Sequence, residues 1–175
     1  ISTFGSIGTP GLAWQVKGAG DINGDGAADI VFQNSTSGDV FAWEQHGLST
    51  IVGGAGTIGT PGTQWQVKGL ADFTADGKSD IVFQNSTTGE VAIWNLNGLA
   101  IASTTILGNP GTVWQVKGTG DINGDGYGDL IFQNSSSGDV FAWELNTVVN
   151  TGVTYNTILQ AGTLGSPGAA WQVAG

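Results

Sequence analysis

Three short acidic segments carry the residue types in this sequence that are best suited to chemistry. Each segment has oxygen-bearing side chains at its positions 1, 3, 5 and 9 and a glycine at position 6. Ca²⁺ is a hard cation that takes carboxylate, amide and carbonyl oxygens, and the glycine permits the sharp turn that directs the backbone carbonyl of position 7 inward. The pattern therefore predicts about three calcium sites, one in each segment. Their ligands would be Asp21, Asn23, Asp25, the Ala27 carbonyl and Asp29; Asp72, Thr74, Asp76, the Lys78 carbonyl and Asp80; and Asp121, Asn123, Asp125, the Tyr127 carbonyl and Asp129.

The second acidic segment departs from the other two. Thr74 replaces an asparagine and Ala75 replaces a glycine, so we expect weaker calcium binding there. Extracellular calcium modules bind at about 10⁻⁴ to 10⁻³ M, and occupancy of such sites requires a calcium-rich environment. The segments therefore favour a secreted protein or one located on the cell surface.

The first six positions also match the calcium loop of helix-loop-helix proteins. That loop needs a bidentate carboxylate at position 12 and helices on both sides. Position 12 is Phe32, Phe83 or Phe132, and each phenylalanine lies in a strand-like Ile-Val-Phe or Leu-Ile-Phe stretch. The helix-loop-helix alternative is therefore excluded.

The acidic segments belong to an internal repeat of about 50 residues, a length that suits a four-stranded propeller blade. Every apolar stretch is short and bounded by Gly, Pro, Asn or Ser, which is typical of strands. We expect an all-β β-propeller built of four-stranded antiparallel blades. In the first unit the strands are predicted at 14–18, 29–33 and 39–44 and within 49–58, so that the acidic segment connects the first two.

The whole chain is interpreted as one propeller segment with three complete blades, at about 8–58, 59–107 and 108–164. Residues 1–7 resemble a last strand, and residues 165–175 repeat a first strand. Closed propellers need roughly four to eight blades. We therefore expect either a part of a longer chain or a homo-oligomer or fibre that completes the propeller.

With a DxNGDGxxD segment between the first two strands of a 50-residue repeat, the sequence resembles the FG-GAP (VCBS-type) repeat family. The bacterial form is especially similar, with Trp-Gln-Val-x-Gly before the acidic segment and Asp-Ile-Val-Phe-Gln-Asn after it. Integrin α-subunit propellers and many secreted propellers belong to this family. The resemblance implies that the residues given above bind Ca²⁺ at the bottom of each blade, with a structural role. It also implies an extracellular module for adhesion, surface structure or recognition, whose partner would be a surface protein or a glycan.

Some members of this architecture are lectins that hold a sugar between blades, with tryptophan as a stacking platform. Tryptophan has a broad apolar face and one N–H donor, which suits a pyranose ring. The candidate ligand-binding residues are Trp43, Trp94 and Trp143 on the third strands. The alternative is that these side chains, together with those on the first strands, pack neighbouring blades against each other.

Composition and charge exclude several other functions. The 14 acidic residues against 4 lysines give a net charge of -10, which argues against nucleic acid as a partner. No apolar run approaches the roughly 18 residues of a membrane span. The three lysines that precede the acidic segments, Lys17, Lys68 and Lys117, are interpreted as outer charges that offset them.

The sequence offers no catalytic constellation, and we expect no enzymatic activity. There is no cysteine, and the single histidine, His46, aligns with Asn97 and Thr147 in the other units. A pair of glycosidase carboxylates would require Glu44 and Glu144. Since the second unit has Asn95 at this position, we interpret these glutamates as polar residues at strand ends.

Overall fold

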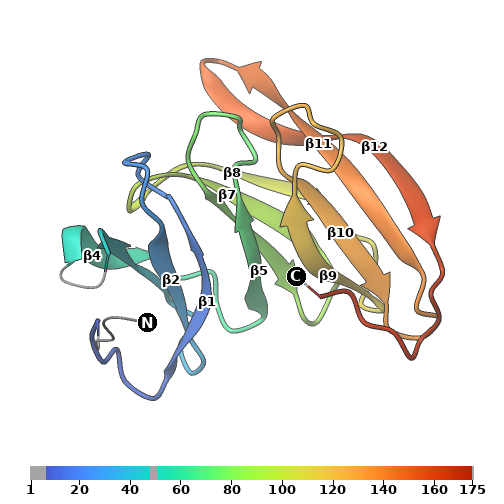
Figure 1. Ribbon diagram of the computed structural model, residues 1–175, viewed down its shortest axis with the longest axis horizontal. Helices are drawn as coiled ribbons and strands as arrows, with labels where there is room; N and C mark the ends of the chain where they lie inside the picture. Colours follow the sequence, from blue (N-terminus) through green and yellow to red (C-terminus); the bar gives the residue numbers. More distant parts are fainter. Residues whose placement is uncertain (1–6, 48–50, 175) are drawn as a thin grey trace.

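The computed structural model describes residues 7–47 and 51–174, which form three four-stranded antiparallel sheets (Figure 1). The first sheet contains β1 (Trp14–Gly20), β2 (Asp29–Asn34), β3 (Val40–Gln45) and β4 (Ile51–Gly59). The second contains β5 (Trp65–Ala71), β6 (Asp80–Asn85), β7 (Val91–Asn97) and β8 (Ala100–Gly108). The third contains β9 (Trp114–Gly120), β10 (Asp129–Asn134), β11 (Val140–Asn150) and β12 (Val153–Gly165). The predicted all-β class and the four-stranded antiparallel units are confirmed.

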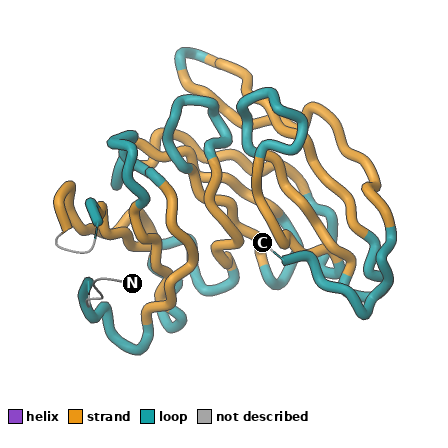
Figure 2. The backbone as a smooth tube through the Cα atoms, viewed as in Figure 1, coloured by secondary structure: helices purple, strands orange, loops and turns teal. Residues whose placement is uncertain are grey.

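Strands and loops account for all of the described chain, in which no helix occurs (Figure 2). None of the described residues therefore forms a helix long and apolar enough to cross a membrane.

The middle sheet is buried on both faces because its second strand carries apolar side chains in both directions. Ile81 and Phe83 of β6 belong to a core shared with Val31 of the first sheet. Val82 points the other way, into a core shared with Leu130 of the third sheet. Successive side chains of a strand alternate between its faces, so the Ile-Val-Phe stretch packs against two neighbouring sheets at once.

A buried glutamine joins each sheet to the segment that follows it. Gln33 of β2 donates from Nε2 to the Trp65 carbonyl (2.7 Å), and its Oε1 accepts from the Val67 amide (3.1 Å). Both partners lie on β5, the first strand of the next sheet. We call this pair of hydrogen bonds the glutamine bridge. It recurs from Gln84 to Trp114 and Val116, and from Gln133 to Trp171 and Val173.

The C-terminal end of the chain differs from the expectation, and the N-terminal prediction is not tested. Residues 171–173 form no strand although they contact Gln133, since no strand of their own unit is present to pair with them. Residues 1–6 of the other predicted partial strand lie outside the described residues, and residue 7 is in an irregular segment.

The hairpin of β11 and β12 is longer than its counterparts and reaches across the second sheet (Figure 1). Ser103 Oγ of β8 donates to the Thr154 carbonyl (2.6 Å), and Asn156 Nδ2 donates to the Phe73 carbonyl (2.8 Å). The third sheet therefore contacts the second through the hairpin as well as through the shared core.

Candidate metal centres and aromatic pockets

The three acidic loops, residues 21–29, 72–80 and 121–129, connect the first and second strands of the three sheets. Each turns twice through the left-handed region, at its positions 4 and 6. Gly24 and Gly26 have φ of 82° and 86°, and Gly124 and Gly126 have φ of 81° and 93°. Residues with a side chain rarely adopt this conformation, so glycine is favoured at both positions.

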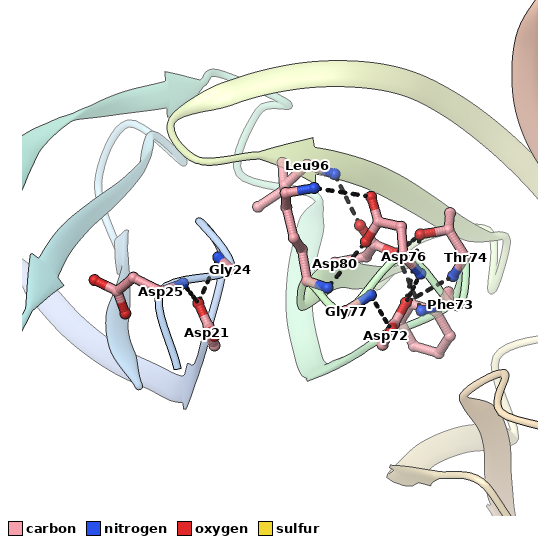
Figure 3. Close-up of polar contacts among 11 residues, drawn as sticks. Asp21, Gly24, Asp25, Asp72, Phe73, Thr74, Asp76, Gly77, Asp80 and Leu96 are labelled. Carbon is pink, nitrogen blue, oxygen red and sulfur yellow. Dashed lines mark hydrogen bonds and ion pairs between the residues drawn. The ribbon is translucent and has the colours of Figure 1, made fainter. Parts of the chain in front are cut away.

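The aspartate at position 1 organises the loop backbone. Asp21 Oδ1 accepts hydrogen bonds from the amides of Gly24 (2.6 Å) and Asp25 (3.2 Å) (Figure 3). Its Oδ2 accepts from the Gly26 amide (2.8 Å). Burial is the largest single influence and raises the pKa of Asp21, but these amides together hold the pKa below its usual value. Asp121 has the same partners in the third loop, and the Gly126 amide is the main cause of its lowered pKa. Both carboxylates are thus fixed in the ionised form.

The aspartate at position 9 is fully buried and ties the loop to the third strand. Asp80 Oδ2 accepts from the Phe73 amide (3.0 Å), and Oδ1 accepts from the Leu96 amide on β7 (2.8 Å) (Figure 3). Burial raises the pKa of Asp80 to about 7, and the charges of Asp76 and Asp72 add to the effect. Asp29 and Asp129 repeat both hydrogen bonds in their own sheets, with pKa values raised mainly by burial.

The predicted ligands share a loop, but their carboxylates face the backbone. Among the residues that the structure describes, no three His, Cys, Asp or Glu side chains converge on a common point. Asp25 points away from Asp21 (Figure 3), and its Oδ1 accepts from the Ala27 amide (2.8 Å). Asn23 Oδ1 accepts from the Asp25 amide (2.9 Å).

The donor chemistry of the loops nevertheless fits calcium. Every predicted ligand atom is an oxygen, and like-charged carboxylates lie close enough to raise the pKa of the buried aspartate in each loop. In the described part of the chain only Lys78 pairs with a loop carboxylate, at 3.3 Å from Asp76 Oδ2. A hard divalent cation is the kind of ion that such a set of oxygens accepts.

The second loop differs in conformation as well as in sequence. Ala75 occupies position 4 with φ of 56°, in a region that disfavours residues with a Cβ atom. Thr74 Oγ1 lies 3.4 Å from both Asp72 Oδ1 and Asp80 Oδ2, so it replaces the asparagine with a different hydrogen-bond pattern.

Two glutamates that the sequence analysis interpreted as strand-end residues lie beside the acidic loops. Glu44 is 8% exposed, and burial followed by the charges of Asp29 and Asp25 raises its pKa. Glu144 Oε2 accepts from Asn123 Nδ2 (3.4 Å). A signal for this was present, because the glutamate occurs in the two units with an asparagine at position 3 and is absent from the unit with Thr74.

Neighbouring acidic loops are joined through their backbones. The Ser79 amide of the second loop donates to the Asp21 carbonyl (2.6 Å), and the Gly128 amide of the third loop donates to the Asp72 carbonyl (2.7 Å). Position 8 of each loop thus contacts position 1 of the loop before it. The three candidate metal centres form one continuous row.

The third-strand tryptophans both pack and line pockets. Trp43, Trp94 and Trp143 lie 4.7–4.8 Å, between ring centroids, from a phenylalanine of the neighbouring second strand. Each also lines an apolar pocket, of about 240, 270 and 380 Å³ in the three sheets. The pockets share a proline, a first-strand tryptophan and a third-strand tryptophan: Pro10, Trp14 and Trp43; Pro61, Trp65 and Trp94; Pro110, Trp114 and Trp143.

The three lysines interpreted as outer charges that offset the loops form no ion pair with a loop carboxylate in the described part of the chain. Lys17, Lys68 and Lys117 lie on β1, β5 and β9, which neighbour one another. Lys68 Nζ donates to Gln115 Oε1 (3.4 Å) and Lys17 Nζ to Gln15 Oε1 (3.1 Å). The proximity of these lysines depends on how the three sheets stack, which the strand pattern of a single unit does not specify.

Comparison with known proteins identifies the repeat. The sequence model of the FG-GAP-like repeat matches residues 21–83 and again residues 72–132. Each match begins at the first aspartate of an acidic loop and ends at the phenylalanine of the second strand in the following unit. Searches among curated proteins and among solved structures gave no match. Because the two matches together cover well over half of the residues, this chain belongs to the FG-GAP-like repeat family.

Proposed function

We propose that this chain is a calcium-stabilised segment of a β-propeller that serves outside the cell in adhesion, surface structure or recognition. The observation that carries the proposal is the row of three acidic loops, whose backbones are hydrogen bonded to one another. Nine of the 14 acidic residues lie in these loops, and each loop buries one of its carboxylates completely. Such a concentration of negative charge opposes folding unless a cation neutralises it.

The residues that would hold the ions are those predicted from the sequence, with Glu44 and Glu144 available beside the first and third loops. Bound calcium would neutralise these carboxylates and fix the connection between the first two strands of each sheet. The role proposed is structural, so the protein would present rigid loops and sheet edges to its partner rather than transform a substrate.

Thermal unfolding with calcium and with a chelator tests this proposal. Calcium at about 100 times its dissociation constant stabilises the folded state by about 2.7 kcal/mol per site, so the melting temperature should rise clearly with calcium and fall with chelator. Asp25→Asn should reduce the calcium-dependent rise. Asp39→Asn is the control, because Asp39 lies outside the loops and accepts from Thr60 Oγ1 (2.6 Å). An identical melting temperature with and without chelator would refute a structural calcium role.

The three aromatic pockets favour a second candidate function, carbohydrate binding. Their repeated proline and two tryptophans offer flat apolar surfaces in volumes of about 240–380 Å³, which suit the C–H face of a pyranose. Glycan-array binding that is lost in Trp43→Phe or Trp143→Phe, with the melting temperature retained, would support a lectin. Trp171→Phe is the control, because Trp171 is 69% exposed and lines none of the three pockets. If the protein bound no glycan on the array, carbohydrate binding would be contradicted and the structural role would remain.

A further inference from the structure

The first strands of the three sheets bring three lysines to one edge of the molecule. We call Lys17, Lys68 and Lys117 the lysine column. β5 lies between β1 and β9 and contacts both (Figure 1). The pKa of Lys68 is lowered by burial first and then by the charges of Lys117 and Lys17. The three ammonium groups are therefore within electrostatic reach of one another.

No carboxylate neutralises the lysine column within residues 7–47 and 51–174. The ion pair found there is that of Lys78 with Asp76, and two of the column lysines, Lys17 and Lys68, contact amide oxygens instead. Lys68 Nζ lies 3.4 Å from Gln115 Oε1, and Lys17 Nζ lies 3.1 Å from Gln15 Oε1. In a chain with a net charge of -10, three clustered cations without an acidic partner need an anion from elsewhere.

A polar cavity of about 160 Å³ adjoins Lys17 between the first and second sheets. It is lined by Gln15, Lys17, Ser35 and Gln66 among other polar residues, and no carboxylate lines it. One water molecule needs about 10–15 Å³ by the same kind of measure, so the cavity has room for a small polyatomic ion. Lysine and glutamine supply N–H donors, which suit the oxygens of an anion.

We propose that the lysine column and the cavity beside Lys17 bind an oxyanion, a sulfate or phosphate group. The negative charge of the group would relieve the repulsion that Lys68 experiences from Lys17 and Lys117. The oxygens would accept hydrogen bonds from Lys17, which lines the cavity, and Lys68 would contribute through its charge. The group would arrive either as the free anion or as an ester on a carbohydrate. The site is separate from the acidic loops and from the aromatic pockets, so the inference does not rest on the proposed function.

Calorimetric titration of the calcium-loaded protein with sodium sulfate, with ionic strength held constant by sodium chloride, tests the proposal. We expect saturable binding of one sulfate per chain. Lys68→Gln removes one ammonium group and should weaken binding by about tenfold or more. Lys78→Gln is the matched control, because it removes the same charge from the second acidic loop; it should change the affinity by less than about twofold.

Absence of saturable binding, or equal weakening by Lys68→Gln and Lys78→Gln, would overturn the proposal, because either result means that sulfate responds to overall charge alone. Lys68→Gln removes a repelling charge, so its melting temperature should not fall, and lost binding cannot then be ascribed to unfolding. Glucose 6-sulfate and glucose distinguish the sources. Tighter binding of the ester than of sulfate assigns the site to sulfated carbohydrate, and weaker or equal binding assigns it to the free anion. Equal binding of glucose and its sulfate would contradict an oxyanion site.

Discussion

Ala75 is the residue at which the second acidic loop departs most clearly from its neighbours in backbone conformation. It has φ of 56°, where the other loops have Gly24 and Gly124. A residue with a side chain loses about 1–2 kcal/mol in the left-handed region, whereas glycine adds about 0.4–1 kcal/mol of entropy to the unfolded chain. Ala75→Gly should therefore raise the free energy of unfolding by up to about 1 kcal/mol, as measured by urea denaturation in chelator.

The matched control for Ala75→Gly is Gly124→Ala in the third loop, where φ is 81°. That change should destabilise the protein by about 1 kcal/mol for the same reason. If glycine at position 75 destabilised the fold, backbone strain would not explain how the second loop differs.

The buried aspartates at position 9 should matter for folding even without a metal. Asp80 accepts one backbone amide with each oxygen, from Phe73 and from Leu96. In Asp80→Asn one oxygen becomes an NH₂ group that faces an N–H donor, and leaving buried polar groups unpaired costs about 1–3 kcal/mol. Denaturation in chelator should show a loss smaller than this range, because the change also removes a buried negative charge, the charge whose burial raises the pKa of Asp80 to about 7. Asp39→Asn is the comparison, because Asp39 lies in an exposed turn. If Asp80→Asn lowered the free energy of unfolding no more than Asp39→Asn does, the amides of Phe73 and Leu96 would have other partners.

At the scale of the element, the glutamine bridge fixes the first strand of one sheet against the second strand of the sheet before it. Gln84 is 2% exposed, donates to the Trp114 carbonyl (2.6 Å) and accepts from the Val116 amide (3.1 Å). Gln84→Leu has a similar volume but leaves both backbone groups unpaired, so we expect a loss of about 2–4 kcal/mol in the free energy of unfolding. Gln64→Leu, at an exposed position without such a bridge, should be close to neutral. Equal stability of the two variants would mean that the bridge does not stabilise the packing between sheets.

Strand positions followed from the sequence because each strand has a short apolar stretch of its own. The strand predicted at 29–33 extends over Asp29–Asn34, and the one predicted at 39–44 extends over Val40–Gln45. Contacts between strands and sheets could not be predicted from these apolar stretches. Glu44 lies beside an acidic loop because of the pairing of β2 with β3, and the lysine column depends on how three sheets are stacked.

The acidic loops illustrate the same limit within a single site. The spacing identified their oxygen-bearing residues and the need for glycine at position 6, since these depend on local chain geometry. The direction of each carboxylate depends on backbone amides that compete for it, such as those of Gly24 and Gly26 around Asp21. The buried position of Asp29 depends on the amide of Gln45 on another strand.

At the scale of the whole molecule, no described residue covers one face of the first sheet in the way that the equivalent faces of the other two sheets are covered. Val67 and Val116 on β5 and β9 are 5% and 4% exposed, whereas Val16 on β1 is 66% exposed. The difference arises because β5 and β9 each receive the core and the glutamine bridge of a preceding sheet. A second copy of the chain would cover this face with its third sheet, in a head-to-tail arrangement, once residues 171–173 no longer occupy that sheet.

Residues 171–173 should oppose such self-association, because they occupy the glutamine bridge of the third sheet. Gln133 holds Trp171 and Val173 by the same two bonds that Gln33 and Gln84 form with a complete strand. Removal of residues 171–175 would free Gln133 for β1 of another copy. Light scattering should then show a larger mass for the shortened chain than for the full chain at the same concentration, and Val16→Lys should reverse the increase by placing a charge in the new interface. Val149→Lys, at an exposed position of the β11–β12 hairpin, should leave the mass unchanged. A shortened chain that stays monomeric would rule out a second copy as the neighbour of β1 and leave a further segment of a longer chain as its cover.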